Sequence, residues 1–351
     1  MERLHGGRYH RARWLEKRGL VWQNSGRGDG VRGRHLLYCM DYHHGQATRV
    51  VLAGLPFVPG ADMAARQAFF RQHLDWVRGV VCAEPRGHTN MLGAVVLPPV
   101  RPDAHAGVIF LHPGGYFDMC GDSAFSTVTA LVDSGMVPPR EGEFAVKLDT
   151  VAGPVDARVR VTGGEVVEVA IANVPSCYLG PVELRAGSLA VGAEVAYGGL
   201  VYAFVDAGAV DLAPLDRQPR ARLLQTGTAL WEAARTLEVK GRRVDLVTVG
   251  EHLPGSARFR VANFYAPATM GRTPSGTGIS ARLALLLARG ELGETGEVVH
   301  ESVLGLSFRA RAREVRPGGE VVPEVTARSY LMGITQLVVK EDDPFPSGFE
   351  L

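Results

Sequence analysis

Residues 117–123 and 272–278 read Phe117-Asp118-Met119-Cys120-Gly121-Asp122-Ser123 and Arg272-Thr273-Pro274-Ser275-Gly276-Thr277-Gly278. Each stretch leads into an apolar segment and places a nucleophile-type residue, Cys120 or Ser275, 15 residues before a glycine. We interpret the two as a degenerate internal duplication of a helix start. The free N–H groups and the positive dipole end of a helix favour an anion, and a glycine lets a ligand approach the backbone. Two such ends facing each other would hold a carboxylate between two side chains.

The segments that follow the two stretches predict the fold. Residues 278–289 are apolar almost all round, so this helix is expected to be buried, and a curved sheet is the structure most suited to enclose it. The 43 glycines and 21 prolines favour many short strands joined by turns. We therefore predict an α/β (α+β) fold with two similar domains, each a curved sheet wrapped around one central helix. Elsewhere, residues 212–226 are predicted to form a helix broken at Pro219, and residues 229–238 a cleaner helix.

The length of 351 residues also favours two domains, because it exceeds one ordinary core. We expect the first over residues 36–170 and the second over 171–300, with strands from about 300 to 351 returning to the first. Residues 1–35 are rich in Arg, Gly and His and lack the apolar core of a signal peptide. They are expected to be disordered or to reflect a start placed too far upstream, since Met40 could begin the protein.

The composition argues against several classes of binding partner. The formal net charge of +1 gives no electrostatic case for nucleic acid or an anionic membrane, and no apolar run approaches the roughly 20 residues of a membrane span. The four cysteines show neither a CxxC pair nor metal-ligand spacing, which argues against a zinc site or a disulfide framework. We therefore expect a cytoplasmic protein without a metal. The oligomeric state is left open, with a homodimer as the candidate assembly.

Cys120 is the strongest candidate for chemistry. A thiol at a helix N-terminus has its pKa lowered from about 8.5, because the dipole and the backbone donors favour the thiolate. Asp122 is open to two interpretations. It is either a simple N-terminal cap of the helix, or a second negative charge that opposes thiolate formation unless a cationic substrate lies between the two groups.

Ser275 has a structural alternative, which is an N-cap and nothing more. A nucleophilic serine would need a histidine base aimed by an acid, and no nucleophile-elbow pattern is present. Gly198 and Gly199, which follow Tyr197, indicate either a bulge or a close approach of the backbone to a ligand. The histidines are expected to be structural: His88 in a polar turn, and the pair at 43 and 44 in a turn or at the surface.

From about Met40 to the C-terminus the chain resembles the proline racemase family. The resemblance rests on an ordered series of motifs: Asp41-Tyr42-His43-His44-Gly45-Gln46-Ala47-Thr48-Arg49, Glu84-Pro85-Arg86-Gly87-His88, Met119-Cys120-Gly121, Asn173-Val174-Pro175-Ser176, Tyr197-Gly198-Gly199, Arg272-Thr273-Pro274-Ser275-Gly276-Thr277-Gly278, His300-Glu301-Ser302 and Pro323-Glu324-Val325-Thr326. It implies a two-domain fold like that of diaminopimelate epimerase, no cofactor, and an active site between the domains that binds a small imino acid. We accordingly predict catalytic roles for Cys120 and Ser275 and substrate contacts from Gly121, Asp122, Ser123, Gly276, Thr277, Gly278, His88 and Tyr197.

The chain departs from the racemase pattern at three positions. Racemases of the family carry a second cysteine where this chain has Ser275, a histidine where it has Asp122, and an aspartate where it has Gly271. Inversion needs an acid and a base on opposite faces of Cα, and a serine hydroxyl titrates too high for that task. The departures at Asp122 and Gly271 suggest a linked exchange, in which Asp122 now holds the ring ammonium of the substrate.

Dehydration needs only one base, and the family's dehydratases keep the first cysteine and usually have threonine at the second position. We therefore predict a lyase that removes the Cα proton and the 3-hydroxyl of trans-3-hydroxy-L-proline, giving Δ1-pyrroline-2-carboxylate. The enzymatic alternative is an isomerase of the family, a 4-hydroxyproline 2-epimerase or a proline racemase, that uses Cys120 with Ser275. A third alternative is an inactive relative that only binds an imino acid.

Overall fold

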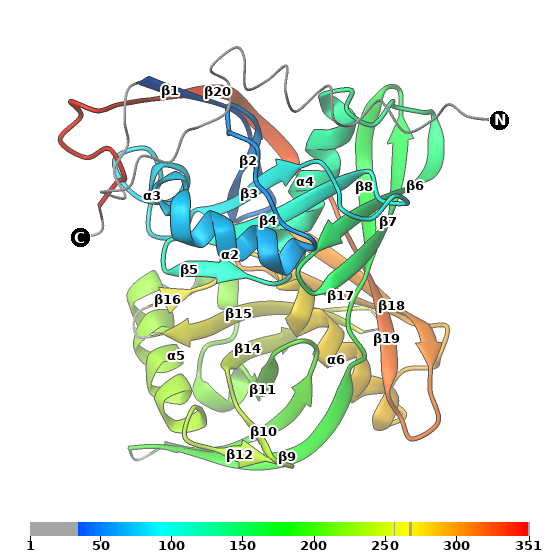
Figure 1. Ribbon diagram of the computed structural model, residues 1–351. Helices are drawn as coiled ribbons and strands as arrows, with labels where there is room; N and C mark the ends of the chain where they lie inside the picture. Colours follow the sequence, from blue (N-terminus) through cyan, green and yellow to red (C-terminus); the bar gives the residue numbers. More distant parts are fainter. Residues whose placement is uncertain (1–33, 188, 256, 267–268, 350–351) are drawn as a thin grey trace.

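The computed structural model describes residues 34–349 except 188, 256 and 267–268. Residues 1–33, and with them most of the segment expected to be disordered or to precede the true start, lie outside the described residues. Within the described part, one sheet of 18 strands runs through the whole molecule and bends around two helices (Figure 1).

The first half of the sheet has the strand order β20, β1, β2, β3, β4, β6, β7, β8, with β5 also paired to β4. These strands are β1 (Arg34–His43), β2 (Ala47–Ala53), β3 (Leu92–Leu97), β4 (Ala106–His112), β5 (Gly115–Phe117), β6 (Gly142–Thr150), β7 (Gly153–Thr162), β8 (Glu165–Ala172) and β20 (Tyr330–Lys340).

The second half continues from β8 in the order β19, β18, β17, β15, β14, β11, β10, β9, with β16 beside β15. These strands are β9 (Cys177–Ala186), β10 (Leu189–Tyr197), β11 (Val201–Asp206), β14 (Leu246–His252), β15 (Arg258–Ala266), β16 (Thr269–Met270), β17 (Glu297–Ser302), β18 (Ser307–Val315) and β19 (Val321–Ala327). A separate two-stranded ribbon joins β12 (Glu238–Val239) to β13 (Arg242–Arg243).

Each half encloses one of the two helices that the opening stretches predict. Helix α4 (Gly121–Asp133) packs against β1, β2, β3 and β8, and α6 (Gly276–Ala288) packs against strands from β9 to β19. Phe125 and Leu131 of α4 share one buried cluster with Leu283 and Leu286 of α6. The predicted α/β class, with a curved sheet around a central helix in each half, is thereby confirmed.

Three further helices cover the outer faces of the sheet. Helices α2 (Met63–His73) and α3 (Asp75–Cys82) lie against β3 and β4, and α5 (Arg220–Ala234) lies against β9, β14 and β15. The prediction for this last region was wrong, because a single helix replaces the two expected segments. Pro219 stands at the N-cap of α5, where its missing N–H costs nothing, so it starts the helix instead of breaking it.

The strand order shows how the two halves of the sheet, which correspond to the two predicted domains, are connected. Strand β20 pairs with β1, and β19 joins β8 to β18, so the end of the chain touches both halves. Because hydrogen bonds run through the junction, the division near residue 170 stays a prediction.

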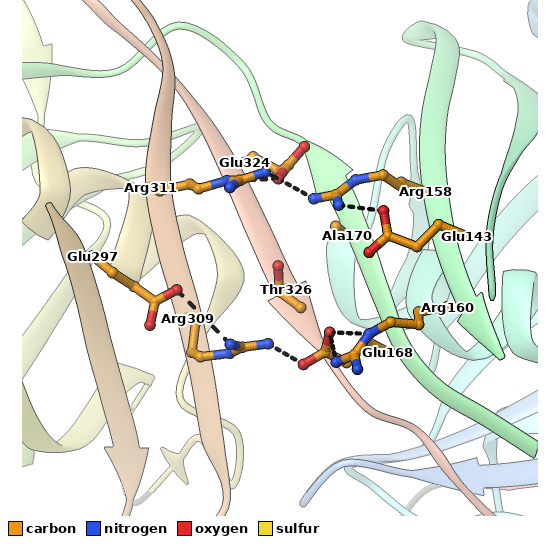
Figure 2. Close-up of a pocket in the computed structure, with 10 residues that line it drawn as sticks. All are labelled: Glu143, Arg158, Arg160, Glu168, Ala170, Glu297, Arg309, Arg311, Glu324 and Thr326. Atoms are coloured by element: carbon orange, nitrogen blue, oxygen red, sulfur yellow. Dashed lines mark hydrogen bonds and ion pairs between the residues drawn. The ribbon is translucent and has the colours of Figure 1, made fainter. Parts of the chain in front are cut away.

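Charged side chains line the outer surface of this junction, where β7 and β8 meet β18 and β19 (Figure 2). Glu324 accepts hydrogen bonds from Arg158 at 2.6 Å and from Arg311 at 2.7 Å. Glu168 pairs in the same way with Arg160 and Arg309. Each of these two carboxylates bridges two arginines, so the network ties the two halves of the sheet together.

Candidate active site

A cavity of about 310 Å³ lies where the N-terminal ends of α4 and α6 approach each other. It contains most of the predicted site residues, and its lining is Phe117, Met119, Cys120, Gly121, Asp122, Phe125, Ile171, Asn173, Val174, Tyr197, Gly199, Leu200, Ser275, Gly276, Thr277 and Val325. A Cβ added at Gly121 or Gly276 would meet nothing within 4 Å, so the backbone at both helix starts is open to a ligand. The two stretches that are far apart in the sequence therefore form one site.

Cys120 is the N-cap residue of α4, and its side chain caps no helix N–H group. The prediction of a lowered pKa was wrong. Burial, and then the charge of Asp122, raise the pKa of the Cys120 thiol to about 11, although the nearby Ser123 hydroxyl and the amides of Ser123 and Asp122 act in the opposite direction. Cys120 is accordingly a neutral thiol at neutral pH.

Asp122 lies in the first turn of α4 and is not its cap. One carboxylate oxygen accepts a hydrogen bond from the Thr273 hydroxyl at 3.2 Å, and the other lies 3.5 Å from Nε2 of His44. Asp122 therefore links three segments: α4, the loop before α6 and the loop after β1. Its carboxylate is about one fifth exposed and faces the cavity.

His44 is the main polar neighbour that sequence reasoning missed. It lies in the turn between β1 and β2, which agrees with the expected turn, but it is not at the surface, because the residue is only 1% exposed. Its Nδ1 lies 3.5 Å from the Ser329 hydroxyl, and its ring packs at 5.8 Å from that of Phe308. The only signal was its place in the motif that begins at Asp41, because its burial depends on distant residues such as Ser329, which is 285 residues further along the chain.

Ser275 is the N-cap of α6, as its structural alternative proposed. Its hydroxyl accepts a hydrogen bond from the N–H of Gly278 at 3.1 Å and its backbone has a φ of 68°. The same hydroxyl lies 2.9 Å from the Tyr202 hydroxyl and 3.3 Å from that of Thr277, and the latter two are 2.7 Å apart. Ser275 is thus one corner of a triangle of three hydroxyl groups.

Tyr202 was not predicted, because its position in β11 matches an ordinary buried strand residue. It is 1% exposed, and burial raises the pKa of its phenol to about 12 although Ser275 and Thr277 donate hydrogen bonds to the charged form. The phenol therefore keeps its proton at neutral pH.

The remaining predicted contacts divide into two groups. Tyr197 lies in the cavity wall, with the guanidinium of Arg242 stacked 4.2 Å above its ring. Ser123 is fully buried below Cys120, and Gly278 serves as the donor to Ser275, so these two support the site from behind. His88, a predicted substrate contact, does not line the cavity. Its Nδ1 accepts a hydrogen bond from the backbone N–H of Asn90 within its own turn.

The two glycines after Tyr197 resolve into different roles. A Cβ at Gly198 would lie 2.5 Å from the backbone N of Ala281, so this residue is a glycine because β10 and α6 touch. Gly199 has a φ of 107° and lines the cavity. The close approach at the first glycine is therefore to a helix, whereas the prediction offered a ligand. The register of β10 with β11 is regular up to Tyr197, but its register with β9 shifts between Val195 and Ala196, just before the glycines.

Other features limit what the site can hold. Among the described residues, no group of three His, Cys, Asp or Glu side chains is arranged to bind a metal ion. All four cysteines are free thiols. No helix in the described segments is long and apolar enough to cross a membrane.

Comparison with known proteins adds the family context. Residues 39–350 match the family model described as proline racemase. A 4-hydroxyproline 2-epimerase of Streptosporangium roseum is 38% identical over 335 residues, which cover 92% of this chain and 100% of that protein. A proline racemase of Clostridioides difficile is 33% identical over 320 residues, covering 88% and 95% of the two chains. A solved structure of a hydroxyproline epimerase from Agrobacterium vitis, with bound trans-4-hydroxy-L-proline, gives a TM-score of 0.77 at 27% identity and covers 92% of this chain and 96% of that one.

Proposed function

Because the chain belongs to the proline racemase family, we propose that it carries out acid–base chemistry at Cα of a proline-type imino acid without a cofactor. Cys120 is the proposed base, since it is the only thiol among the cavity-lining residues. The open backbone at Gly121 and Gly276 would receive the substrate carboxylate between two helix starts.

Dehydration of trans-3-hydroxy-L-proline is the reaction that the site geometry supports best, and the hydrogen bonding of Ser275 is the observation that carries it. The hydroxyl is held by Gly278, Tyr202 and Thr277, and none of these partners is a histidine or carboxylate that could activate it. An alcohol titrates too high to exchange the Cα proton at neutral pH. The site then has one competent acid–base group, which is enough for elimination and too few for inversion.

The proposed steps all occur on one face of the ring. The 3-hydroxyl of this substrate is trans to the carboxylate and so lies on the same side as the Cα hydrogen. The Cys120 thiolate takes the Cα proton, the C3–O bond breaks, and the new thiol returns the proton to the departing hydroxide as water. The resulting enamine rearranges to Δ1-pyrroline-2-carboxylate.

Asp122 is proposed to bind the ring ammonium and to allow the thiolate to form. The ammonium would neutralise the charge that raises the pKa of Cys120, so substrate binding favours ionisation of the thiol. Gly271 offers no competing carboxylate, although a Cβ there would meet only ordinary contacts, at 3.5 Å from Asn263. The absence of a side chain at this position is therefore not imposed by crowding.

The second candidate is 2-epimerisation of 4-hydroxyproline or racemisation of proline, and the comparisons favour it, since the curated relatives reported above are an epimerase and a racemase. In this case the second face of Cα would be served by Ser275, with Tyr202 as the source of its proton at 2.9 Å. This route requires the buried phenol to act as an acid, which is why we place it second.

A substrate screen tests the choice. Proline and the stereoisomers of 3- and 4-hydroxyproline are incubated with the protein and assayed for cyclic imine with o-aminobenzaldehyde and for optical rotation. We expect imine from trans-3-hydroxy-L-proline and none with Cys120→Ser, while Ser275→Ala keeps most of the turnover. Inversion of any isomer would support the epimerase, and binding without turnover would indicate an inactive relative.

We also propose a cytoplasmic location for the protein. Four free thiols fit the reducing cytoplasm better than an oxidising compartment. A homodimer remains the proposed assembly.

A further inference from the structure

A second cavity, of about 390 Å³, lies at the end of the second half of the sheet that is remote from the catalytic cavity. The two cavities share no lining residue. Strand β11 connects them: it starts beside Leu200 at the catalytic cavity and ends at Asp206 in the wall of the second one. In Figure 1, β11 and β14 lie to the left of α6, within the lower half of the molecule.

The second cavity contains Arg282 of α6, which is only 8% exposed. Its guanidinium lies over two aromatic rings, 4.1 Å from the centre of Phe204 and 4.4 Å from that of Phe259. Gly250 leaves room beside the N–H edge of the guanidinium, since a Cβ there would lie 2.9 Å from Nη2.

This buried cation has no carboxylate partner among the described residues. Its Nε is buried without a hydrogen bond, and its electrostatic neighbours, Asp206 and Glu291, form no ion pair with it. Burial lowers the pKa of Arg282 to about 10, so the group is still charged at neutral pH. A buried charge is normally paired, and cation–π contacts compensate only part of its lost hydration.

The two acids in the cavity wall are engaged elsewhere. Asp206 accepts hydrogen bonds from the amides of Gly208 and Ala209, at 2.8 and 3.2 Å. Glu194 pairs with Arg289 and accepts from the hydroxyl of Tyr178. Their charges disfavour a dianion such as phosphate in the same cavity.

We propose that this cavity is a second ligand site, in which Arg282 binds a small monocarboxylate through the N–H edge of its guanidinium. The planar fork matches a carboxylate in bidentate geometry. The remaining wall includes Pro181, Val182, Ala193 and Val205, so the tail of the ligand is apolar.

The test is an NMR titration of the full-length, ¹⁵N-labelled protein with sodium acetate, and a titration with sodium chloride at equal ionic strength is the reference. The arginine Nε–H signals are followed, and the signal that is missing in Arg282→Met is assigned to Arg282. We expect it to shift saturably with acetate and not with chloride. Gly250→Ala keeps the charge but crowds Nη2, and should weaken acetate binding about tenfold or more. The exposed Arg140→Met serves as the matched control and should leave binding unchanged.

Three results would overturn the proposal: no saturable shift of the Arg282 signal, an equal response to chloride or phosphate, or unchanged acetate affinity in Gly250→Ala. Acetate bound in the catalytic cavity does not touch Arg282, so this outcome is independent of the reaction proposed above.

Discussion

At the scale of single residues, the state of Cys120 depends on two opposing influences. Its place at the start of α4 favours the thiolate, but burial and the charge of Asp122 outweigh this and raise the pKa of the thiol to about 11. Under the proposed function, the ring ammonium of the substrate would lie near Asp122 and offset its charge. Cys120 would then ionise more readily when the substrate is bound.

Asp122→Asn tests this electrostatic coupling. Since the carboxylate raises the pKa of Cys120, its removal should lower that pKa, and alkylation of Cys120 by iodoacetamide should reach half its maximum rate at a lower pH. Mass spectrometry of the Cys120 peptide gives the rate, and Asp118→Asn, an exposed neighbour, is the control. The Michaelis constant for the imino acid should rise at least about tenfold with the loss of one charged contact. An unchanged alkylation profile would contradict the assignment.

Tyr202→Phe tests whether the phenol has a chemical role. Ser275 and Thr277 can still bond to each other at 3.3 Å, so we expect a stability loss of about 1 kcal/mol in urea unfolding. Under the dehydratase proposal, imine formation should fall by no more than a few fold. Tyr116→Phe, which removes a hydroxyl bonded to Asp75 in the other half, controls for loss of a buried hydroxyl. A selective loss of turnover would instead assign Tyr202 a role as proton source.

At the scale of elements, α6 and β10 are in backbone contact at Gly198. A methyl group there would lie 2.5 Å from the N of Ala281, and backbone atoms have little freedom to move. Gly198→Ala should therefore destabilise the protein by about 1–3 kcal/mol, measured by denaturant unfolding, and displace the helix start that carries Ser275. Gly192→Ala in β10, the strand that ends just before Gly198, is the control, because a methyl group there meets nothing within 4 Å.

The ion-pair network of Figure 2 predicts how stability depends on pH. Burial alone would raise the pKa of Glu324, but hydrogen bonds from Arg311 and Arg158 leave it below its usual value of 4.5. A lowered carboxylate pKa gives stability that is fully present above the unfolded value and is lost as pH falls through the folded one. Glu324→Gln should thus reduce stability by up to about 1 kcal/mol at pH 7 and by less below pH 4.

Thermal unfolding across this pH range measures the effect, with Glu314→Gln, at the exposed end of β18, as the control. An equal loss at both ends of the range would mean that the charge of Glu324 is not responsible.

At the scale of the whole molecule, local patterns predicted what is local. The apolar periodicity of α4 and α6, the N-cap at Ser275 and the two open glycines could all be recognised within short windows. The contacts of Asp122 with His44 and Thr273 could not, because they join segments that are 78 and 151 residues apart and require the order of the strands. The predicted direction of the Cys120 pKa shift was wrong for the same reason, since the thiol is buried by strands that are distant in the sequence.

If Cys120 is the one acid–base group at Cα, incubation in deuterated water distinguishes elimination from inversion. The protein is given trans-3-hydroxy-L-proline and trans-4-hydroxy-L-proline separately, and the products are followed by NMR. We expect Δ1-pyrroline-2-carboxylate from the first compound and no inverted product from the second. Accumulation of the inverted 4-hydroxyproline with deuterium at Cα would contradict it, and would assign the second face to Ser275.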